Sequence, residues 1–289
     1  MKFIFKGYTL FILLVILTIV SLFIGVSQLS LIDIFHLSDE QINILFSSRI
    51  PRTVSILLSG SSLALSGLIM QQMMQNKFVS PTTAGTMEWA KLGILLSLLF
   101  FPNGHILIKL LFAVVLSIVG TFLFVQLINL IRVKDVIFVP LLGIMIGGIL
   151  SSFTTFVALR TNALQSIGNW LTGNFAVITS GRFEVLYLTI PLLILAFVFA
   201  NHFTIAGMGK DFSHNLGVSY EKIIKIALFI TATLTALVVV TVGTLPFLGL
   251  IVPNIISIYR GDHLKNALPH TLMLGAIFVL IADIIGRII

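Results

Sequence analysis

The chain has 289 residues, of which 58% are hydrophobic and 9% are charged, and its formal net charge is +7. These figures exclude a disordered chain, which needs low hydrophobicity and high charge, and an ordinary soluble enzyme, which needs more polar side chains to cover its surface. The predicted fold is therefore all-α, a polytopic transmembrane helical bundle. The length allows about ten spans of about 20 residues each.

The composition also limits the kinds of site. The chain has no cysteine, which excludes disulfides and thiolate metal sites, and no metal site is expected. Its basic residues form no run, so nucleic acid is not an expected partner. All histidines fall in predicted loops or at helix ends, and no H-E-x-x-H or G-x-S-x-G motif occurs. These absences argue against an intramembrane enzyme.

Nine apolar runs follow one another along the chain. They are Tyr8–Val26, Thr53–Met74, Leu92–Phe101, Leu107–Ile131, Val136–Leu159, Glu184–Ala200, Ile223–Leu245, Phe247–Ile258 and Thr271–Ile289. The first is too long for a typical signal peptide, and no cleavage site follows it, so it is predicted to be a retained span. The third run is short, so its helix is expected to begin near Thr83. The eighth, bracketed by Pro246 and Pro253, is predicted to be a broken or half-spanning helix.

The charges predict which side each loop faces. If the N-terminus is cytoplasmic and every run crosses, the inside set is Lys2, Lys6, Lys77, Lys91, Arg132, Lys134, Lys210, Lys222, Lys225, Arg260 and Lys265. The outside set is Arg49, Arg52, Lys109, Arg160, Arg182 and Arg287. The excess inside is the direction that the positive-inside rule predicts. Two outer stretches, Ser27–Arg52 and Arg160–Phe183, are also polar.

Small residues mark one face of the second run. Gly60, Ala64 and Gly67 share this face, and serines lie beside it. Such a face allows helix backbones to approach closely, and the alternative is that it lines a pathway. Gly143, Gly147 and Gly148 on the fifth run leave the same two interpretations open.

The longest hydrophilic loop, Asn201–Lys222, contains a helix-compatible stretch from Gly209 to Gly217. Glycine before it and Leu216-Gly217 after it are typical of the ends of a short amphipathic helix. This helix is either a plain surface element or a docking point for a soluble partner. It is no phosphate loop, because Thr204 and Asp211 stand where the motif needs glycine and a hydroxyl residue.

Five segments together resemble the permease family of bacterial ABC importers for ferric siderophores, haem and vitamin B12. The first is Arg49-Ile50-Pro51-Arg52 with the Gly-rich second run, and the second is the Gln72…Asn76…Pro81 loop. The third is Trp170-Leu171-Thr172-Gly173, and the fourth is the Gly209…Leu216-Gly217 loop. The fifth is Gly249-Leu250-Ile251-Val252-Pro253, followed by Arg260-Gly261-Asp262-His263 and Ala282-Asp283…Arg287. Each segment is weak alone, but their order covers the chain from about residue 49 to the end.

The resemblance implies a single permease domain over residues 1–289 in the bacterial cytoplasmic membrane, which is a transport subunit and not an enzyme. A dimer with a second permease copy or a paralogue is implied. Cytoplasmic ATPase subunits would hold ATP and Mg, so this chain would bind no cofactor directly, and an extracytoplasmic binding protein would deliver the substrate. The commonest cargo of the family is a ferric siderophore, with haem and cobalamin as alternatives. An uncoupled channel is a further alternative.

The resemblance also implies residue roles. The ATPase-coupling loop is matched by Gly209, Lys210, Asp211, Ser213, Leu216 and Gly217. Outward basic positions that dock the binding protein are matched by Arg49, Arg52 and Arg287, although Asp283 could pair with Arg287 one helical turn away. A translocation pathway is predicted along Gly60, Ser62, Ser66, Gly67, Gln72, Asn76, Pro81, Gly249 and Pro253.

Three departures from the family pattern stand out. Glu88 and Lys91 occupy a stretch that is usually rich in glycine and alanine. They could form an interfacial pair near the cytoplasmic surface or line the pathway, and the sequence favours the interfacial pair. Lys77 follows Asn76 where the family often has proline. The family's tenth helix does not follow the ninth run, so we expect either an incomplete chain or a truncated member.

Overall fold

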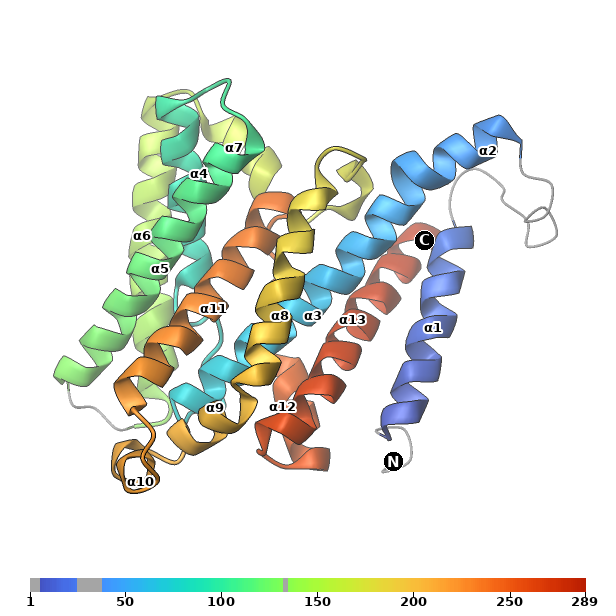
Figure 1. Ribbon diagram of the computed structural model, residues 1–289. Helices are drawn as coiled ribbons and strands as arrows, with labels where there is room; N and C mark the ends of the chain where they lie inside the picture. The colour runs from blue at the N-terminus through green and yellow to red at the C-terminus, as the bar shows by residue number, and fades with distance from the viewer. Residues whose placement is uncertain (1–5, 25–37, 132–134) are drawn as a thin grey trace.

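The computed structural model describes residues 6–24, 38–131 and 135–289, which form a bundle of helices (Figure 1). The helices are α1 (Gly7–Phe23), α2 (Asp39–Ile44), the π-helix η2 (Leu45–Arg49), α3 (Ile50–Met73), α4 (Thr86–Phe100), α5 (Ile106–Ile131), α6 (Phe138–Arg160), α7 (Leu164–Leu171), the 3-10 helices η3 (Phe175–Val177) and η4 (Phe183–Leu188), α8 (Thr189–Val198), α9 (Ala200–Ala206), α10 (Lys210–Asn215), α11 (Tyr220–Thr241), α12 (Leu248–Arg260) and α13 (Leu264–Ile288). Within these residues, pairing of β type is limited to one isolated bridge between Thr172 and Thr244.

The long helices run in alternating directions between two ends of the bundle (Figure 1). We call the end that holds the start of α1 and α10 the lower end, and the end that holds α2 and α7 the upper end. This alternation confirms the predicted order of segments. The segments that carry the predicted inside charges lie at the lower end and those that carry the predicted outside charges lie at the upper end, with one exception. Lys91 pairs with Glu88, which lies beside Gly147 in the middle of α6, so this predicted inside charge is not at the lower end. Lys2, Arg132 and Lys134 of that count, and residues 27–37 of the first outer stretch, lie outside the described residues.

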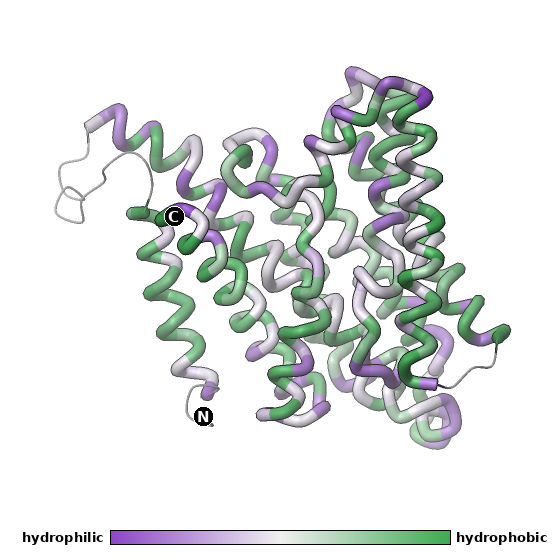
Figure 2. Tube along the Cα trace, turned by 180° about the vertical axis from the view of Figure 1, so that it is seen from behind, coloured by the Kyte–Doolittle hydropathy of each residue, from purple (hydrophilic) through white to green (hydrophobic). Residues whose placement is uncertain are grey.

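Hydrophobic residues occupy most of the length of the helices, and hydrophilic residues gather toward the two ends (Figure 2). Five of the described helices are long and apolar enough to span a membrane, and the bent pair Phe183–Val198 and Ala200–Ala206 would make a sixth. The helices α1 and α12 are apolar but shorter. The described part of the chain is therefore a multi-pass helical membrane protein.

Two short segments take the form that the sequence predicted. The helix α12 has 13 residues with Pro253 inside it, and it follows Phe247 in the left-handed region at φ +63°. It is the short, interrupted segment expected there. The helix α4 begins at Thr86, close to the expected start near Thr83, after Gly85 at φ +75°. Glycine adopts this conformation without steric cost.

The run Glu184–Ala200, predicted to be one span, is formed by two helices, and α9 continues it after a bend that the sequence did not predict. The 3-10 helix η4 leads into α8, and a bend of 59° separates this segment from α9. Pro191 is the third residue of α8. Its missing N–H lies in the first turn, where the backbone donors have no partner inside the helix, so the proline is tolerated there.

The helix α3 lies at the centre and packs against α13, α11 and α12. A Cβ placed on Gly60 would lie 2.7 Å from the Gly275 carbonyl oxygen, and one on Gly67 would lie 1.7 Å from that of Gly249. Only hydrogen at these positions lets the backbones approach so closely. The contacts favour the packing interpretation for Gly60, Gly67 and Gly249.

Candidate functional site

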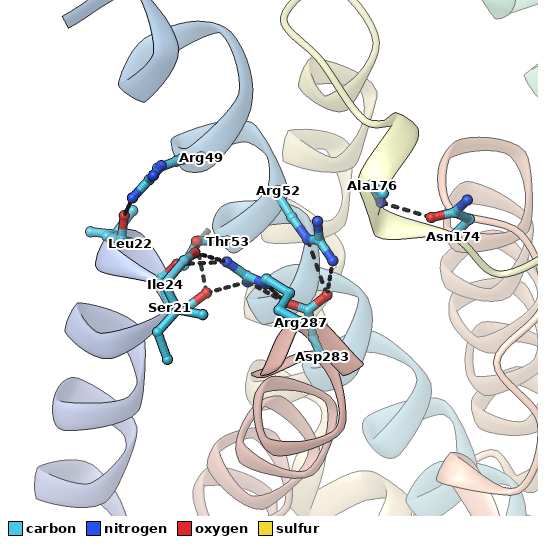
Figure 3. Close-up of polar contacts among 10 residues, drawn as sticks. All are labelled: Ser21, Leu22, Ile24, Arg49, Arg52, Thr53, Asn174, Ala176, Asp283 and Arg287. Carbon is cyan, nitrogen blue, oxygen red and sulfur yellow. Dashed lines mark hydrogen bonds and ion pairs between the residues drawn. The ribbon is translucent and has the colours of Figure 1, made fainter. Parts of the chain in front are cut away.

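A cluster of charged side chains lies at the upper end, where α3 meets α13 (Figure 3). Arg52 donates to Asp283 Oδ1 from Nη2 at 2.7 Å and from Nε at 3.1 Å. Arg287 donates to Asp283 Oδ2 from Nε at 2.7 Å and from Nη2. The predicted pair one helical turn apart is confirmed, and the same carboxylate also holds an arginine of the central helix.

Arg287 and a third arginine, Arg49, donate hydrogen bonds to the upper end of α1. Arg287 Nη1 donates to the carbonyl oxygens of Ser21 at 2.8 Å and Ile24 at 2.9 Å. Arg49 Nη1 donates to those of Leu22 at 2.7 Å and Phe23 at 2.9 Å. The last carbonyls of a helix have no partner inside it and carry a partial negative charge. The guanidinium groups therefore satisfy and neutralise the C-terminus of α1.

These contacts bear on the predicted docking role of Arg49, Arg52 and Arg287. Arg49 is 6% exposed, and the side chains of Arg287 and Arg52 are 8% and 22% exposed. All three lie at the upper end, as predicted, but they point into the bundle. A cavity of about 380 Å³ opens beside Arg52 and Asp283. Docking of a partner by these arginines stays a prediction.

At the lower end, α10 forms the short helix that the sequence predicted between Gly209 and Gly217. Gly209 is at φ +107° and Gly217 at φ +72°, so each end uses a conformation that favours glycine. Ser213 is buried, and its hydroxyl donates to the Gly209 carbonyl at 2.8 Å. Lys210 and Asp211 are exposed.

The segment around α10 exposes three apolar side chains. Met208, Phe212 and Leu216 follow one another at intervals of four and are 58%, 47% and 54% exposed. Phe212 lies in α10 and Leu216 is the residue that caps its C-terminus, so these two side chains lie on the same side of the helix, whereas Met208 precedes the helix. The sequence analysis named Leu216 but not Met208 or Phe212, although the three apolar residues recur at every fourth position.

The segment before α10 contacts the lower end of α3. Gln75 Nε2 donates to the Gly207 carbonyl at 3.0 Å, and a Cβ on Gly207 would collide with the Gln72 side chain. Asn76 Nδ2 donates to the Val136 carbonyl at 2.8 Å. The predicted loop residues Gln72 and Asn76 thus connect α3 to the segments around α10 and α6.

Lys77 forms a second connection at the lower end of α3. Its Nζ contacts Ser257 Oγ at 2.6 Å and forms an ion pair with Asp262, while Asn254 Nδ2 donates to the Lys77 carbonyl at 2.8 Å. Burial raises the pKa of Asp262, but hydrogen bonds from Lys77 and Ser257 and the charge on Lys77 outweigh it and hold that pKa below its ordinary value. Sequence reasoning missed this pair.

The remaining predicted pathway residues lie inside the bundle. Ser66 donates to the Ser62 carbonyl at 2.8 Å, and Pro81 and Pro253 are buried. A Cβ on Gly249 would lie 2.8 Å from the Leu63 carbonyl oxygen. Their role in a pathway stays a prediction.

The unusual charges of α4 pair with each other. Lys91 Nζ lies 2.6 Å from Glu88 Oε1, and the two side chains are 18% and 21% exposed. Glu88 Oε2 is buried without a hydrogen-bond partner. Within the described residues, no group of three or more His, Asp or Glu side chains could hold a metal ion.

Comparisons with known proteins agree with this architecture. The chain is 55% identical to the petrobactin import system permease protein YclN of Bacillus subtilis, over 97% of this chain and 89% of that protein. It is 38% identical to the petrobactin import permease FatD of Bacillus anthracis, over 96% and 81%. It is 36% identical to the ferric-anguibactin transport permease FatD of Vibrio anguillarum, over 93% and 86%.

A solved structure of a metal-chelate type ABC transporter in an inward-facing conformation is similar to this chain with a TM-score of 0.79. The two are 25% identical over 97% of this chain and 90% of the other. Residues 13–289 match the FecCD transport family, and this range includes nearly all of the helices described above. The chain therefore belongs to the FecCD transport family and is a permease subunit of an ABC importer.

Proposed function

We propose that this permease imports a ferric siderophore across the bacterial cytoplasmic membrane. The observation that carries the proposal is the agreement among the three relatives at 36–55% identity, which are named for petrobactin or anguibactin import. Haem and cobalamin are the alternative cargoes, and no described side chain chooses among them.

The energy for import would come from ATPase subunits docked at the lower end. The exposed apolar side chains of Met208, Phe212 and Leu216 in this segment support the assignment, because exposed apolar residues on a loop suit a protein interface. ATP and Mg would bind to those subunits and not to this chain. Movement of α10 would reach α3 through Gln75 and Gly207, and the turn between α12 and α13 through Lys77 and Asp262.

The other partners follow from the same arrangement. An extracytoplasmic binding protein would dock on the upper end and release its substrate there. A second permease, either another copy or a paralogue, would complete the pathway, and lipid would cover the remaining apolar faces.

The test is uptake in cells that lack their own iron-chelate permeases. The permease is produced together with its ATPase and binding protein, and the uptake of three radiolabelled compounds is compared: ferric petrobactin and haem labelled in their iron, and cobalamin labelled in its cobalt. We expect ferric petrobactin or another ferric siderophore to accumulate in an ATP-dependent way. Uptake of haem or cobalamin without any ferric siderophore would overturn the substrate assignment. ATP-independent uptake would overturn the importer assignment.

A further inference from the structure

Two cations at the upper end share one aromatic ring. Arg182, just before η4, places its Cζ 4.2 Å from the centre of the Trp170 ring, and Lys109 on α5 places its Nζ 5.3 Å from the same centre. Such contacts are favourable for each cation. The indole, however, carries no charge that could balance two positive groups.

Within the part of the chain that the structure describes, neither cation has a carboxylate within ion-pair distance. Lys109 Nζ donates to the Gly104 carbonyl at 2.9 Å, and its residue is 9% exposed. Arg182 Nε is buried and has no hydrogen-bond partner. Burial lowers the pKa of Arg182. The two positive charges are therefore close together without a carboxylate of the described residues beside them.

The contrast with the other arginines of the upper end is informative. Arg52 and Arg287 share Asp283, and Arg49 donates to carbonyl oxygens of α1. Their donors are therefore already used inside the protein. Lys109 and Arg182, by contrast, lie together on one ring with no carboxylate of the described residues within ion-pair distance.

We propose that Lys109, Trp170 and Arg182 form a docking site for an aspartate or glutamate side chain of the extracytoplasmic binding protein. This inference rests on the proposed function. Arg182 and Trp170 are half-buried and remain accessible, and a planar guanidinium suits a carboxylate. The buried Lys109 strengthens the local positive potential.

The position of Lys109 favours a protein carboxylate over a lipid phosphate. The outward face of α5 is formed by Leu107, Leu111 and Val115, which are 54%, 61% and 47% exposed. Lys109 is buried on another side of the helix, and Trp170 packs against the interior core. The cluster therefore lies toward the inside of the bundle and away from the face that meets lipid.

The test measures association of the binding protein with the complete importer in lipid nanodiscs. The probe is the soluble form of the binding protein that supports uptake through this permease. We expect Arg182→Glu to lower the association rate at least about tenfold and to flatten its dependence on salt, because docking charges act mainly on that rate. Arg182→Lys should keep most of the rate. A matching Asp or Glu→Arg change on the binding protein should restore binding to Arg182→Glu.

The matched control is Arg160→Glu, which makes the same change of charge at the same end. Arg160 lies on α6 near the Phe156 ring and is exposed. Equal rates for Arg182→Glu, Arg160→Glu and the unchanged protein would overturn the proposal. So would a loss of binding that disappears when phosphatidylglycerol is omitted, which would identify a lipid site. Thermal unfolding of each variant separates lost docking from lost folding, and Trp170→Phe provides a milder second variant.

This result is separable from that of the uptake experiment. Ferric siderophore uptake with unaffected docking in Arg182→Glu would reject the docking site alone. Absence of such uptake in the unchanged protein would reject the substrate, while the binding measurement could still be made.

Discussion

Arg52 and Asp283 lie 231 positions apart in the chain, and their side chains meet at 2.7 Å at the upper end of the bundle. The carboxylate is 5% exposed and serves a second arginine at the same time. One acidic group thus holds the central helix α3 to α13 and balances part of the charge of both arginines.

Replacing Asp283 with asparagine removes this charge but keeps the shape. Two guanidinium groups then lie without a counter-charge in a buried cluster, so we expect a loss of stability of about 3 kcal/mol. Thermal unfolding in detergent measures the effect. Asp211→Asn on the exposed α10 is the matched control and should change the midpoint little. Equal midpoints for the two variants would contradict the assigned role of Asp283.

Gly67→Ala tests the close contact between α3 and α12. The new Cβ would lie 1.7 Å from a backbone oxygen of Gly249, which cannot move aside as a side chain could. We expect a loss of about 2 kcal/mol or of folded protein altogether. Gly148→Ala is the control, since nothing lies within 4 Å of its Cβ. It should be neutral or stabilising by up to about 1 kcal/mol, because alanine favours helix. Similar yields and thermal unfolding midpoints for Gly67→Ala and Gly148→Ala would show that the contact between α3 and α12 is looser than described.

Gly209→Ala tests coupling at α10. Its backbone, at φ +107° and ψ 168°, strains any other residue by about 1–3 kcal/mol, so the start of α10 should shift. We expect uptake to fall several-fold while the permease stays folded. Gly181→Ala, at φ +91° in an upper loop, introduces a similar strain away from α10. Undiminished uptake in Gly209→Ala, with the ATPase still bound, would show that α10 does not couple.

Lys77→Met removes the ion pair with Asp262 at the lower end. Both side chains are about half exposed, at 47% and 59%, so the stability cost should stay below about 1 kcal/mol. Transport per ATP hydrolysed should fall several-fold, because the turn before α13 loses its connection to α3. The exchange of the two charges, Lys77→Asp with Asp262→Lys, should recover part of the lost transport per ATP. Unchanged transport per ATP in Lys77→Met would reject this connection.

The pH dependence of the same pair follows from the lowered pKa of Asp262. A carboxylate with a lowered pKa contributes its stabilisation above its ordinary value of 3.8, and the contribution is lost as the pH falls through the lowered pKa. Between pH 5 and pH 8 the pair should therefore persist. Any change of uptake in that range should be the same in Lys77→Met and in the unchanged protein.

The helices were largely predictable because span length and composition are local properties. The run Leu107–Ile131 corresponds almost residue by residue to α5. The bend between α8 and α9 and the π-helix η2 were not predicted. Hydropathy records how apolar a segment is and carries no information on where the backbone hydrogen bonds change partner.

Among the candidate sites, too, the features with a local signal in the sequence were predictable and those that join distant segments were not. The ends of α10 were predictable because glycines mark them locally, and the pair of Asp283 with Arg287 was predictable from its spacing of one helical turn. Arg52 with Asp283, and Lys77 with Asp262, could not be read from the sequence. Each of these pairs joins helices whose relative placement is set by packing across the whole bundle.

The capping of α1 by Arg287 has a consequence for biogenesis. Ser21 and the arginine that binds its carbonyl are 266 positions apart, so α1 enters the membrane long before its capping group has been synthesised. Until then α1 has only the neighbouring segment of Arg49 and Thr53 as a partner, and its 17 residues without a charged side chain allow its other faces to meet lipid. Docking of α1 against α13 is therefore a late event in assembly. A substitution at Arg287 should appear first as an N-terminal helix that is open to proteolysis while the remainder of the bundle has formed.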